Sequence, residues 1–182
     1  MSKHILVVSQ YFYPENFRIN DMCDEWVKRG YKVTVLTGIP NYPQGKFYKG
    51  YGFFKRRKEV VNGVNVIRIP IVPRGKHPFT LAMNYLSFVI SGWLWKTFTR
   101  IQADIVFNFE VSPMTQALPA VWYAKRKKIS SFVYIQDLWP DNVQVVGGIK
   151  NTRILRYLEK ITNSIYRKST KLLVTSESFK NT

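Results

Sequence analysis

The sequence predicts an α/β fold, a doubly wound and mostly parallel Rossmann-like sheet with helices on both faces. Short apolar runs rich in Val and Ile alternate with longer amphipathic segments along the chain. The first amphipathic segment ends in a glycine that leads directly into another apolar run, as in a βαβ unit. The length of 182 residues suits one domain, and no internal repeat or low-complexity tract divides it.

The first βαβ unit lies at the N-terminal end of the sequence. His4–Ser9 is almost continuously apolar, which is typical of a parallel strand covered on both faces. Residues 17–29 carry apolar side chains at helical spacing, and Cys23 is one of them. We therefore interpret Cys23 as a core side chain and not as a nucleophile. Gly30 ends this helix, and Tyr31–Thr37 should form a strand parallel to the first.

A long loop and a hairpin follow this unit. Gly38–Phe54 is rich in Gly, Pro, Asn and Tyr, and a loop of this length within a domain is usually functional or mobile. The predicted strands Glu59–Val61 and Val64–Ile69 flank Asn62-Gly63, which is the strongest short signal for a β-hairpin. We therefore expect a hairpin at this point.

The most apolar stretch, Phe79–Phe98, allows three interpretations. It could be a helix packed in a soluble domain, an interfacial helix that docks on a membrane, or a membrane span. Asn84, Ser87 and Ser91 form a polar stripe at i, i+3 and i+7, which a lipid-facing span does not need. The stripe favours the packed helix, while nearby basic runs keep the interfacial helix open.

The second half of the chain continues the alternation of strands and helices. Further strands are expected at Ala103–Phe109, at Ser131–Val133 and at Lys171–Thr175. A helix should follow Pro113 with Ser112 as its cap, and Pro119 predicts a kink or a late start in that helix. Another helix should begin with Asn151 or Thr152 as its cap.

Polar side chains follow the predicted strands where each strand ends. The carboxyl ends of parallel strands share one edge of a sheet, where open α/β sheets bind ligands. The candidates at this edge are Gln10, Glu110, Ser112, Asp137 and Glu177. Asp137 follows an apolar strand and precedes a Trp-Pro pair, so we regard it as the leading candidate. The pattern favours a cleft for a polar substrate, although ordinary helix caps would produce a similar pattern.

Several common site motifs are missing from the sequence. The turn after the first strand, Gln10–Pro14, has no glycine, so it cannot form the G-x-G-x-x-G turn of a dinucleotide site. Neither a Walker A motif nor a G-x-S-x-G nucleophile elbow is present. His4 and His77 are far in sequence from any Cys or carboxylate pair that could share a metal ion, so we predict no metal site.

The net charge implies an anionic partner. The chain has 28 Lys and Arg against 11 Asp and Glu, a formal charge of +17, with dense basic runs at Lys55–Lys58 and Lys125–Lys128. Such charge suits a membrane surface, a nucleic acid or a phosphorylated substrate, although each run could be only a solvated face. No zinc-finger spacing, RNA-binding aromatic motif or basic zipper is present, so we expect no nucleic acid partner.

Four segments together resemble the N-terminal half of a GT-B glycosyltransferase of the retaining family 4: residues 5–15, 28–38, 61–68 and 136–141. The specific pieces are Gln-Tyr-Phe-Tyr-Pro at 10–14 and Gln-Asp-Leu-Trp-Pro at 136–140, because helix–glycine–strand units are common in many folds. The resemblance covers the whole chain. Within that family it resembles bacterial enzymes that build capsule, O-antigen or colanic-acid sugars (WbuB-like).

The resemblance implies a two-domain enzyme whose active site lies between two lobes. Residues 1–182 would form the acceptor-side lobe, and the donor-binding C-terminal domain would lie outside this chain. It further implies a nucleotide-sugar donor as substrate, no cofactor and no metal. The acceptor would be a glycan or a polyprenyl-diphosphate-linked sugar at the inner face of the cytoplasmic membrane, so the enzyme would be cytoplasmic and peripheral. Glycines that the family often has after the first strand are missing here, which argues against a donor-phosphate contact from residues 10–16.

On this basis we expect a hexosyl- or N-acetylhexosaminyltransferase lobe of surface polysaccharide synthesis that is inactive alone. Asp137 would be the catalytic residue and would orient the acceptor hydroxyl. The substrate-binding residues would be Gln10, Tyr13, Asn16, Asn41, Tyr42, Glu110, Ser112, Trp139 and Glu177. The main alternative is a non-catalytic Rossmann-like module that binds an anionic membrane surface or a protein partner.

Overall fold

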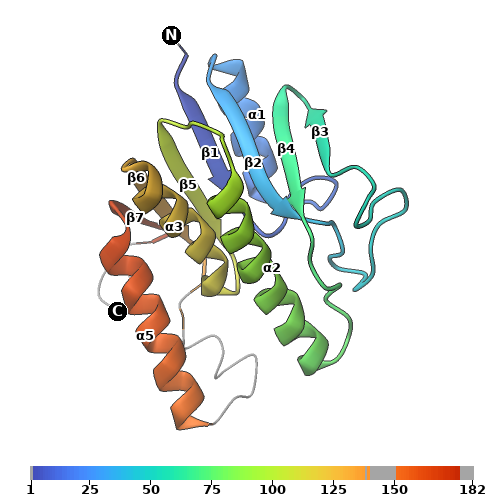
Figure 1. The fold of residues 1–182 in the computed structure, drawn as a ribbon, viewed down its shortest axis with the longest axis vertical. Coiled ribbons are helices and arrows are strands. Elements are labelled where there is room, and N and C mark those ends of the chain that lie inside the picture. The colour runs from blue at the N-terminus through green and yellow to red at the C-terminus, as the bar shows by residue number, and fades with distance from the viewer. Residues whose placement is uncertain (1, 138, 140–150, 177–182) are drawn as a thin grey trace.

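The computed structural model describes residues 2–137, 139 and 151–176. They form a seven-stranded sheet in the order β3-β4-β2-β1-β5-β6-β7 (Figure 1). The strands are β1 His4–Val8, β2 Lys32–Gly38, β3 Lys58–Val61, β4 Val64–Ile69, β5 Ile105–Glu110, β6 Ser130–Ile135 and β7 Lys171–Val174. All neighbouring pairs are parallel except β3 with β4. The predicted doubly wound α/β fold is therefore confirmed.

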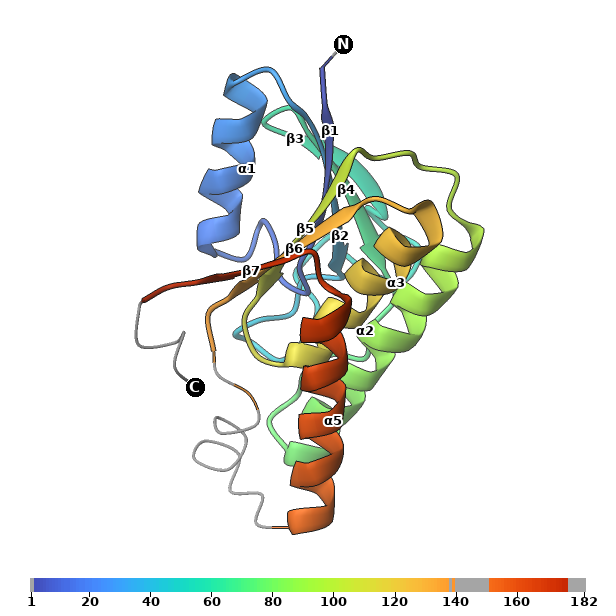
Figure 2. The ribbon, with the colours of Figure 1, turned by 90° about the vertical axis from the view of Figure 1, so that its left-hand side faces the viewer.

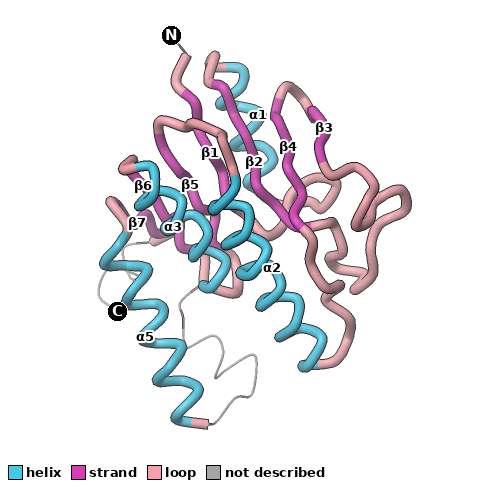
Figure 3. The backbone as a smooth tube through the Cα atoms, in the orientation of Figure 1, coloured by secondary structure: helices cyan, strands magenta, loops and turns pink. Residues whose placement is uncertain are grey.

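Helices cover both faces of the sheet (Figure 2). The helical elements are α1 Arg18–Lys28, α2 Pro78–Phe98, a 3-10 turn at Met114–Ala117, α3 Leu118–Lys127 and α5 Thr152–Lys168. Helix α1 lies on one face, while α2, α3 and α5 lie on the other. Because the strands other than β3 run the same way, the loops that follow them emerge at one end of the sheet (Figure 3).

The amphipathic stripe of α1 fills the core on its face of the sheet. Ile19 and Cys23 are fully buried, and Met22, Trp26 and Val27 pack beside them against the strands. Burial raises the pKa of the Cys23 thiol, so the side chain stays a neutral thiol. The expectation that Cys23 is a core residue is confirmed. Gly30 follows the helix with φ +84°, a conformation that favours glycine at a helix end.

The hairpin of β3 and β4 forms where the sequence predicts it. Asn62 and Gly63 both have positive φ, 50° and 81°, as a two-residue hairpin turn requires. The strand β4 then pairs in parallel with β2, with Thr34 opposite Asn65 and Gly38 opposite Ile69. One strand of the hairpin thus extends the parallel sheet, and the other ends it with an antiparallel edge.

Helix α2 packs on the sheet and on α3 through one face that combines polar, small and apolar residues. Asn84, Phe88 and Gly92 face inward and are buried. A Cβ atom on Gly92 would lie 2.3 Å from Cγ of Pro119, so the glycine permits the close approach of α2 to α3. Ser91 donates a hydrogen bond of 2.6 Å to the Pro70 carbonyl. In the described part of the chain, no helix is long and apolar enough to cross a membrane.

The structure confirms one of two predicted helix caps and contradicts the other. Asn151 caps α5, because its Oδ1 accepts hydrogen bonds from the amides of Arg153 and Ile154. Ser112 does not cap the helix after Pro113, so that expectation was wrong. The Ser112 hydroxyl donates instead to Asp137. The late start predicted at Pro119 is confirmed, since a 3-10 turn precedes α3 and the proline lies in the first turn of α3.

Candidate functional site

Asp137, Ser112 and Trp139 meet at the carboxyl edge of the sheet. The amide and the hydroxyl of Ser112 both donate to Oδ2 of Asp137, at 2.9 and 2.8 Å, and Nε1 of Trp139 donates to the Ser112 hydroxyl at 3.1 Å. The register of β5 with β6, in which Glu110 lies opposite Ile135, brings the two strand ends together. Three residues named from the sequence thus form one hydrogen-bonded group.

The carboxylate of Asp137 is held by donors yet partly open. Both hydrogen bonds from Ser112 end on Oδ2, so Oδ1 takes no part in them. The side chain is half-buried, which keeps one side accessible to solvent. A fixed carboxylate of this kind can accept a hydrogen bond from a hydroxyl group or receive its proton.

Glu110 lies beside Asp137 but in a different environment. Its side chain is fully buried, and within the described residues neither carboxylate oxygen has hydrogen-bond geometry with a partner. Burial, and then the negative charge of Asp137, raise the pKa of Glu110 to about 8, although the nearby amides of Asp137 and Gln136 lower it in part. Glu110 is therefore mainly neutral near pH 7. Tyr166 of α5 lies close enough that burial and Glu110 raise its pKa to about 12.

Gln10 is buried below the edge and tied to other elements. Its amide donates to Oε1 of Gln116 at 2.8 Å, and its Nε2 donates to Oδ1 of Asn84 at 2.7 Å. Asn84 in turn donates to the Val72 carbonyl at 2.6 Å. The approach of β2 depends on Gly38, where a Cβ would lie 3.1 Å from the Gln10 carbonyl and 2.5 Å from Cδ1 of Ile71. The buried Gln10 side chain positions neighbouring segments, and no surface of it is exposed for a substrate.

The segment Asn41-Tyr42 is anchored by Glu15. Oε1 of Glu15 accepts hydrogen bonds from the amides of Asn41 and Tyr42, at 2.8 and 2.7 Å, and its Oε2 accepts one from Phe12 at 3.3 Å. Burial raises the pKa of Glu15 to about 7 against these hydrogen bonds and the charge of Arg68, which lower it. Asn41 is itself fully buried, so it cannot border an acceptor directly. The loop is therefore fixed at its start.

Arg74 and Tyr85 complete the edge and were missed from the sequence. Nη1 of Arg74 donates to the Tyr11 hydroxyl at 3.4 Å, and its guanidinium lies 5.1 Å from the Tyr42 ring centroid. Burial raises the pKa of Tyr85; the charge of Asp137 raises it further, while Arg74 lowers it. Arg74 could have been predicted from the sequence, because it follows a strand of the parallel sheet, as Asp137 does. Tyr85 had no such signal, since it lies inside an apolar helix.

The remaining predicted site residues lie apart from this group or outside the described residues. Tyr13 is 46% exposed, and its carbonyl accepts a hydrogen bond of 2.8 Å from Arg68. Asn16 is exposed in the same loop. Glu177 lies outside the residues that the structure describes. We refer below to Asp137, Ser112, Trp139 and Glu110, together with Tyr42, Arg74 and Tyr85, as the rim.

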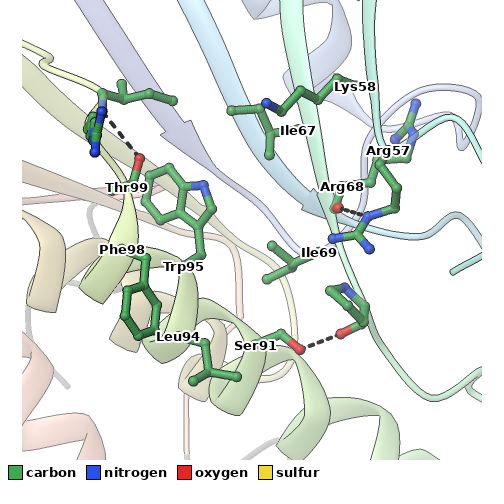
Figure 4. A pocket seen from close by; sticks show the side chains of 13 residues that line it. Arg57, Lys58, Ile67, Arg68, Ile69, Ser91, Leu94, Trp95, Phe98 and Thr99 are labelled. Carbon is green, nitrogen blue, oxygen red and sulfur yellow. Dashed lines mark hydrogen bonds between the residues drawn. The ribbon is translucent and has the colours of Figure 1, made fainter. Parts of the chain in front are cut away.

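A separate groove of about 770 Å³ opens between β4 and the C-terminal half of α2 (Figure 4). Trp95 and Phe98 line one side, and Arg57 and Lys58 line the other. None of the residues that line it belongs to the rim. The Arg57 guanidinium is occupied by the carbonyls of Arg68 and Phe53. This groove and the polar edge of the sheet are thus two different places.

Comparison with solved structures shows a similarity to CalG4, the calicheamicin glycosyltransferase. The two share 12% sequence identity with a TM-score of 0.47, over 100% of this chain and 44% of that chain. The chain therefore spans less than half the length of that protein. No match was found among the curated proteins. A family profile described as a glycosyl transferase 4-like domain matches residues 16–181, and the chain, with its parallel sheet and polar rim, belongs to that family.

Proposed function

We propose that this chain is the acceptor-binding lobe of a retaining glycosyltransferase of bacterial surface polysaccharide synthesis. The enzyme would move a hexosyl or N-acetylhexosaminyl group from a nucleotide-sugar donor to a lipid-linked or glycan acceptor. The family supports sugar transfer in general. The observation that carries the proposal is the Asp137 carboxylate, held by two donors from Ser112 at the ligand-binding edge of the sheet.

In this proposal Asp137 orients the acceptor hydroxyl. Oδ2 is occupied by Ser112, so Oδ1 would accept the hydrogen bond from the hydroxyl. Trp139 would present its ring to a sugar face, with the indole held by its hydrogen bond to Ser112. The neutral Glu110 beneath them would add no second negative charge near pH 7. Asp137 would then be the carboxylate that contacts the acceptor hydroxyl.

During transfer the acceptor oxygen bonds to the anomeric carbon and the bond from that carbon to the nucleotide diphosphate breaks. The hydroxyl proton passes from the acceptor oxygen to Oδ1 of Asp137, and the departing diphosphate needs positive charge to stabilise it. We propose that a second, donor-binding domain supplies most of that charge. The rim would hold only the acceptor half of the reaction.

The test is a transfer assay with the full-length protein, radiolabelled UDP-N-acetylglucosamine and other nucleotide sugars, and a polyprenyl-diphosphate-linked monosaccharide. Labelled sugar should appear in the lipid fraction. The chain of residues 1–182 alone should give none. Turnover by that chain alone would refute the two-lobe proposal, and absence of transfer from every donor to lipid or glycan acceptors would refute the proposed reaction.

We also propose that the protein docks on the anionic inner face of the cytoplasmic membrane through α2. Large apolar side chains of α2 are at least 44% exposed: Phe79, Leu86, Ile90, Trp93, Leu94 and Phe98. Lys96 lies 5.7 Å from the Trp93 ring centroid, and Arg126 donates to the Lys96 carbonyl. Exposed apolar area next to cationic charge suits an anionic lipid surface. The same helix carries Tyr85 to the rim, so a lipid-linked acceptor would arrive beside Asp137.

Sedimentation with vesicles of phosphatidylcholine and phosphatidylglycerol tests the docking. Ile90→Ser should lower the bound fraction several-fold, because it removes apolar area from the membrane-facing side of α2. Phe54→Ser is the matched control, since Phe54 is 99% exposed elsewhere on the molecule. Equal loss in both variants would contradict docking through α2. Strong vesicle binding without sugar transfer by the full-length protein would favour the non-catalytic module.

A further inference from the structure

Arg74 is a cation of the loop between β4 and α2 that has no acidic partner within residues 2–137, 139 and 151–176. The ion pairs within the described part of the chain join Arg29 to Glu25 and Arg68 to Glu59. Arg74 is half-buried, so its guanidinium is partly removed from water. A cation in that position gains more from an anionic ligand than an exposed one does, because solvent screens it less.

The position of the Arg74 side chain is fixed by its neighbours. Its amide donates to Oδ1 of the buried Asn41 at 2.8 Å. Its Nη1 donates to the hydroxyl of Tyr11 at 3.4 Å, and the guanidinium lies 5.1 Å from the Tyr42 ring centroid. Tyr11 stacks on Phe17 with 5.1 Å between the ring centroids, so the aromatic support is itself packed. A guanidinium held in this way loses little freedom when it binds a ligand.

The backbone next to Arg74 is also constrained. Gly75 has φ +60°, a conformation that favours glycine, and a Cβ there would lie 2.3 Å from Oγ1 of Thr80. The Gly75 amide donates to the Gly45 carbonyl at 3.1 Å, which joins this loop to the loop after β2. The loop therefore presents Arg74 in one conformation.

Arg74 and Asp137 both influence the Tyr85 phenol. Both charges act on the pKa of the Tyr85 phenol, in opposite directions, so both are close to it. The guanidinium and the carboxylate that would orient the acceptor hydroxyl thus act on the same phenol, and they form no ion pair with each other among the described residues. A ligand with a hydroxyl for Asp137 and an anion for Arg74 would match this pair of opposite charges.

We propose that Arg74 binds a diphosphate group that a substrate of the sugar transfer presents to the rim. The inference rests on the proposed function, in which both the polyprenyl-diphosphate acceptor and the nucleotide-sugar donor carry that group. The planar guanidinium offers parallel N–H donors whose spacing matches phosphate oxygens. The Tyr11 hydroxyl accepts from Nη1, and the described residues take none of the other N–H groups of the guanidinium, which remain for the ligand.

Calorimetric titration of the purified protein with pyrophosphate, geranyl diphosphate and UDP tests this site. Arg74→Gln should raise the Kd of at least one of them about tenfold, the effect of losing a hydrogen bond to a charged group. Arg74→Lys should give an intermediate Kd, because it keeps the charge and loses the planar donors. Geranyl diphosphate represents the acceptor and UDP the donor, so the probe that responds identifies the source.

Lys76→Gln is the matched control, since Lys76 is exposed in the same loop and the variant loses the same charge. Its Kd values should stay within about twofold of the wild type. An equal effect of Lys76→Gln, no effect of Arg74→Gln on any probe, or a wild-type protein that binds none of them would overturn the inference. If Arg74→Gln unfolds, Arg74→Lys must show the weakened binding.

Two different results would refute the Arg74 site and the proposed sugar transfer. Sugar transfer by a full-length Arg74→Gln protein with unchanged diphosphate binding would refute this inference alone. Arg74-dependent diphosphate binding without transfer to any acceptor would refute the proposed reaction alone.

Discussion

The two halves of the sheet edge differ in how their buried carboxyl groups are satisfied. Around β1 and β2, Glu15 accepts three backbone N–H groups, and Gln10, Asn41 and Asn84 are joined by side-chain and backbone hydrogen bonds. Around β5 and β6, Glu110 is buried without such a bond among the described residues. Oε1 of Gln10 in the first half also has no partner among the described residues, but Glu110 lacks one for both of its oxygens. Buried carboxyl groups usually have partners, so we interpret Glu15 as part of a scaffold and Glu110 as part of a site.

Two neighbouring carboxyl groups show the same contrast on a smaller scale. Asp137 is half-buried and accepts two hydrogen bonds from Ser112, whereas Glu110 is fully buried and its pKa rises to about 8. Two carboxylates side by side cannot both ionise easily, so the buried one keeps its proton. Both residues carry a carboxyl group, so their different roles follow from their positions. Glu110 lies below the edge of the sheet, and Asp137 lies at the edge.

The largest effect should come from removing the charge of Asp137. Asp137→Asn should lower kcat/KM for transfer by the full-length protein about 1000-fold, or about 4 kcal/mol, because the amide cannot receive the acceptor proton. Glu110→Gln should change it less than about fivefold, because Glu110 is already mainly neutral near pH 7. Steady-state kinetics of both variants measures the contrast. Equal losses would show that the two carboxyl groups act as one unit.

Loss of the Glu15 side chain should mainly affect stability. Glu15→Ala should lower the free energy of unfolding by about 3 kcal/mol, because three backbone N–H groups lose their acceptor inside the protein. Urea denaturation followed by tryptophan fluorescence measures this change. Glu25→Ala, at an exposed position of α1, should leave the unfolding midpoint nearly unchanged. A Glu15→Ala protein as stable as the wild type would refute the scaffold role of this half.

The raised pKa of Glu110 predicts a dependence of stability on pH. Between pH 4.5 and about 8 the folded protein keeps a proton on Glu110 that the unfolded chain releases, so stability falls as pH rises. The unfolding free energy of the wild type should therefore fall, relative to Glu110→Gln, by about 1.4 kcal/mol per pH unit. Urea denaturation of both proteins at pH 5, 6, 7 and 8 gives the difference. Parallel pH profiles would contradict the buried neutral carboxyl.

The smallest effect should follow from the Ser112 hydroxyl. Ser112→Ala removes one of two hydrogen bonds to Oδ2 of Asp137 and the acceptor for Trp139, but it keeps the backbone amide donor. We expect kcat/KM of the full-length protein to fall about fivefold, or about 1 kcal/mol. Ser112→Thr keeps the hydroxyl and serves as the control. A fall as large as that of Asp137→Asn would mean that Ser112 contacts the substrate itself.

Much of the fold follows from local patterns. The stripe of α1, the Asn62-Gly63 turn and the alternation of strands and helices each depend on neighbours in sequence, so they could be predicted. The prediction that Ser112 caps a helix was wrong, because a hydroxyl has several possible hydrogen-bond partners. The partner that the fold supplied, Asp137, lies 25 residues away in sequence.

The sequence by itself determined that Asp137, Glu110 and Ser112 end parallel strands and therefore share one edge, because strand direction is set by the connecting helices. Only the tertiary structure decided that Glu110 lies below the edge with no hydrogen-bond partner in the described part of the chain, that Gln10 and Asn41 are internal, and that Arg74 and Tyr85 join the rim. Burial and long-range hydrogen bonds depend on how distant segments pack, and no local pattern records that. Local sequence patterns therefore determine the fold. Tertiary packing determines the environment of each polar side chain, and for Glu110 that environment also sets the protonation state.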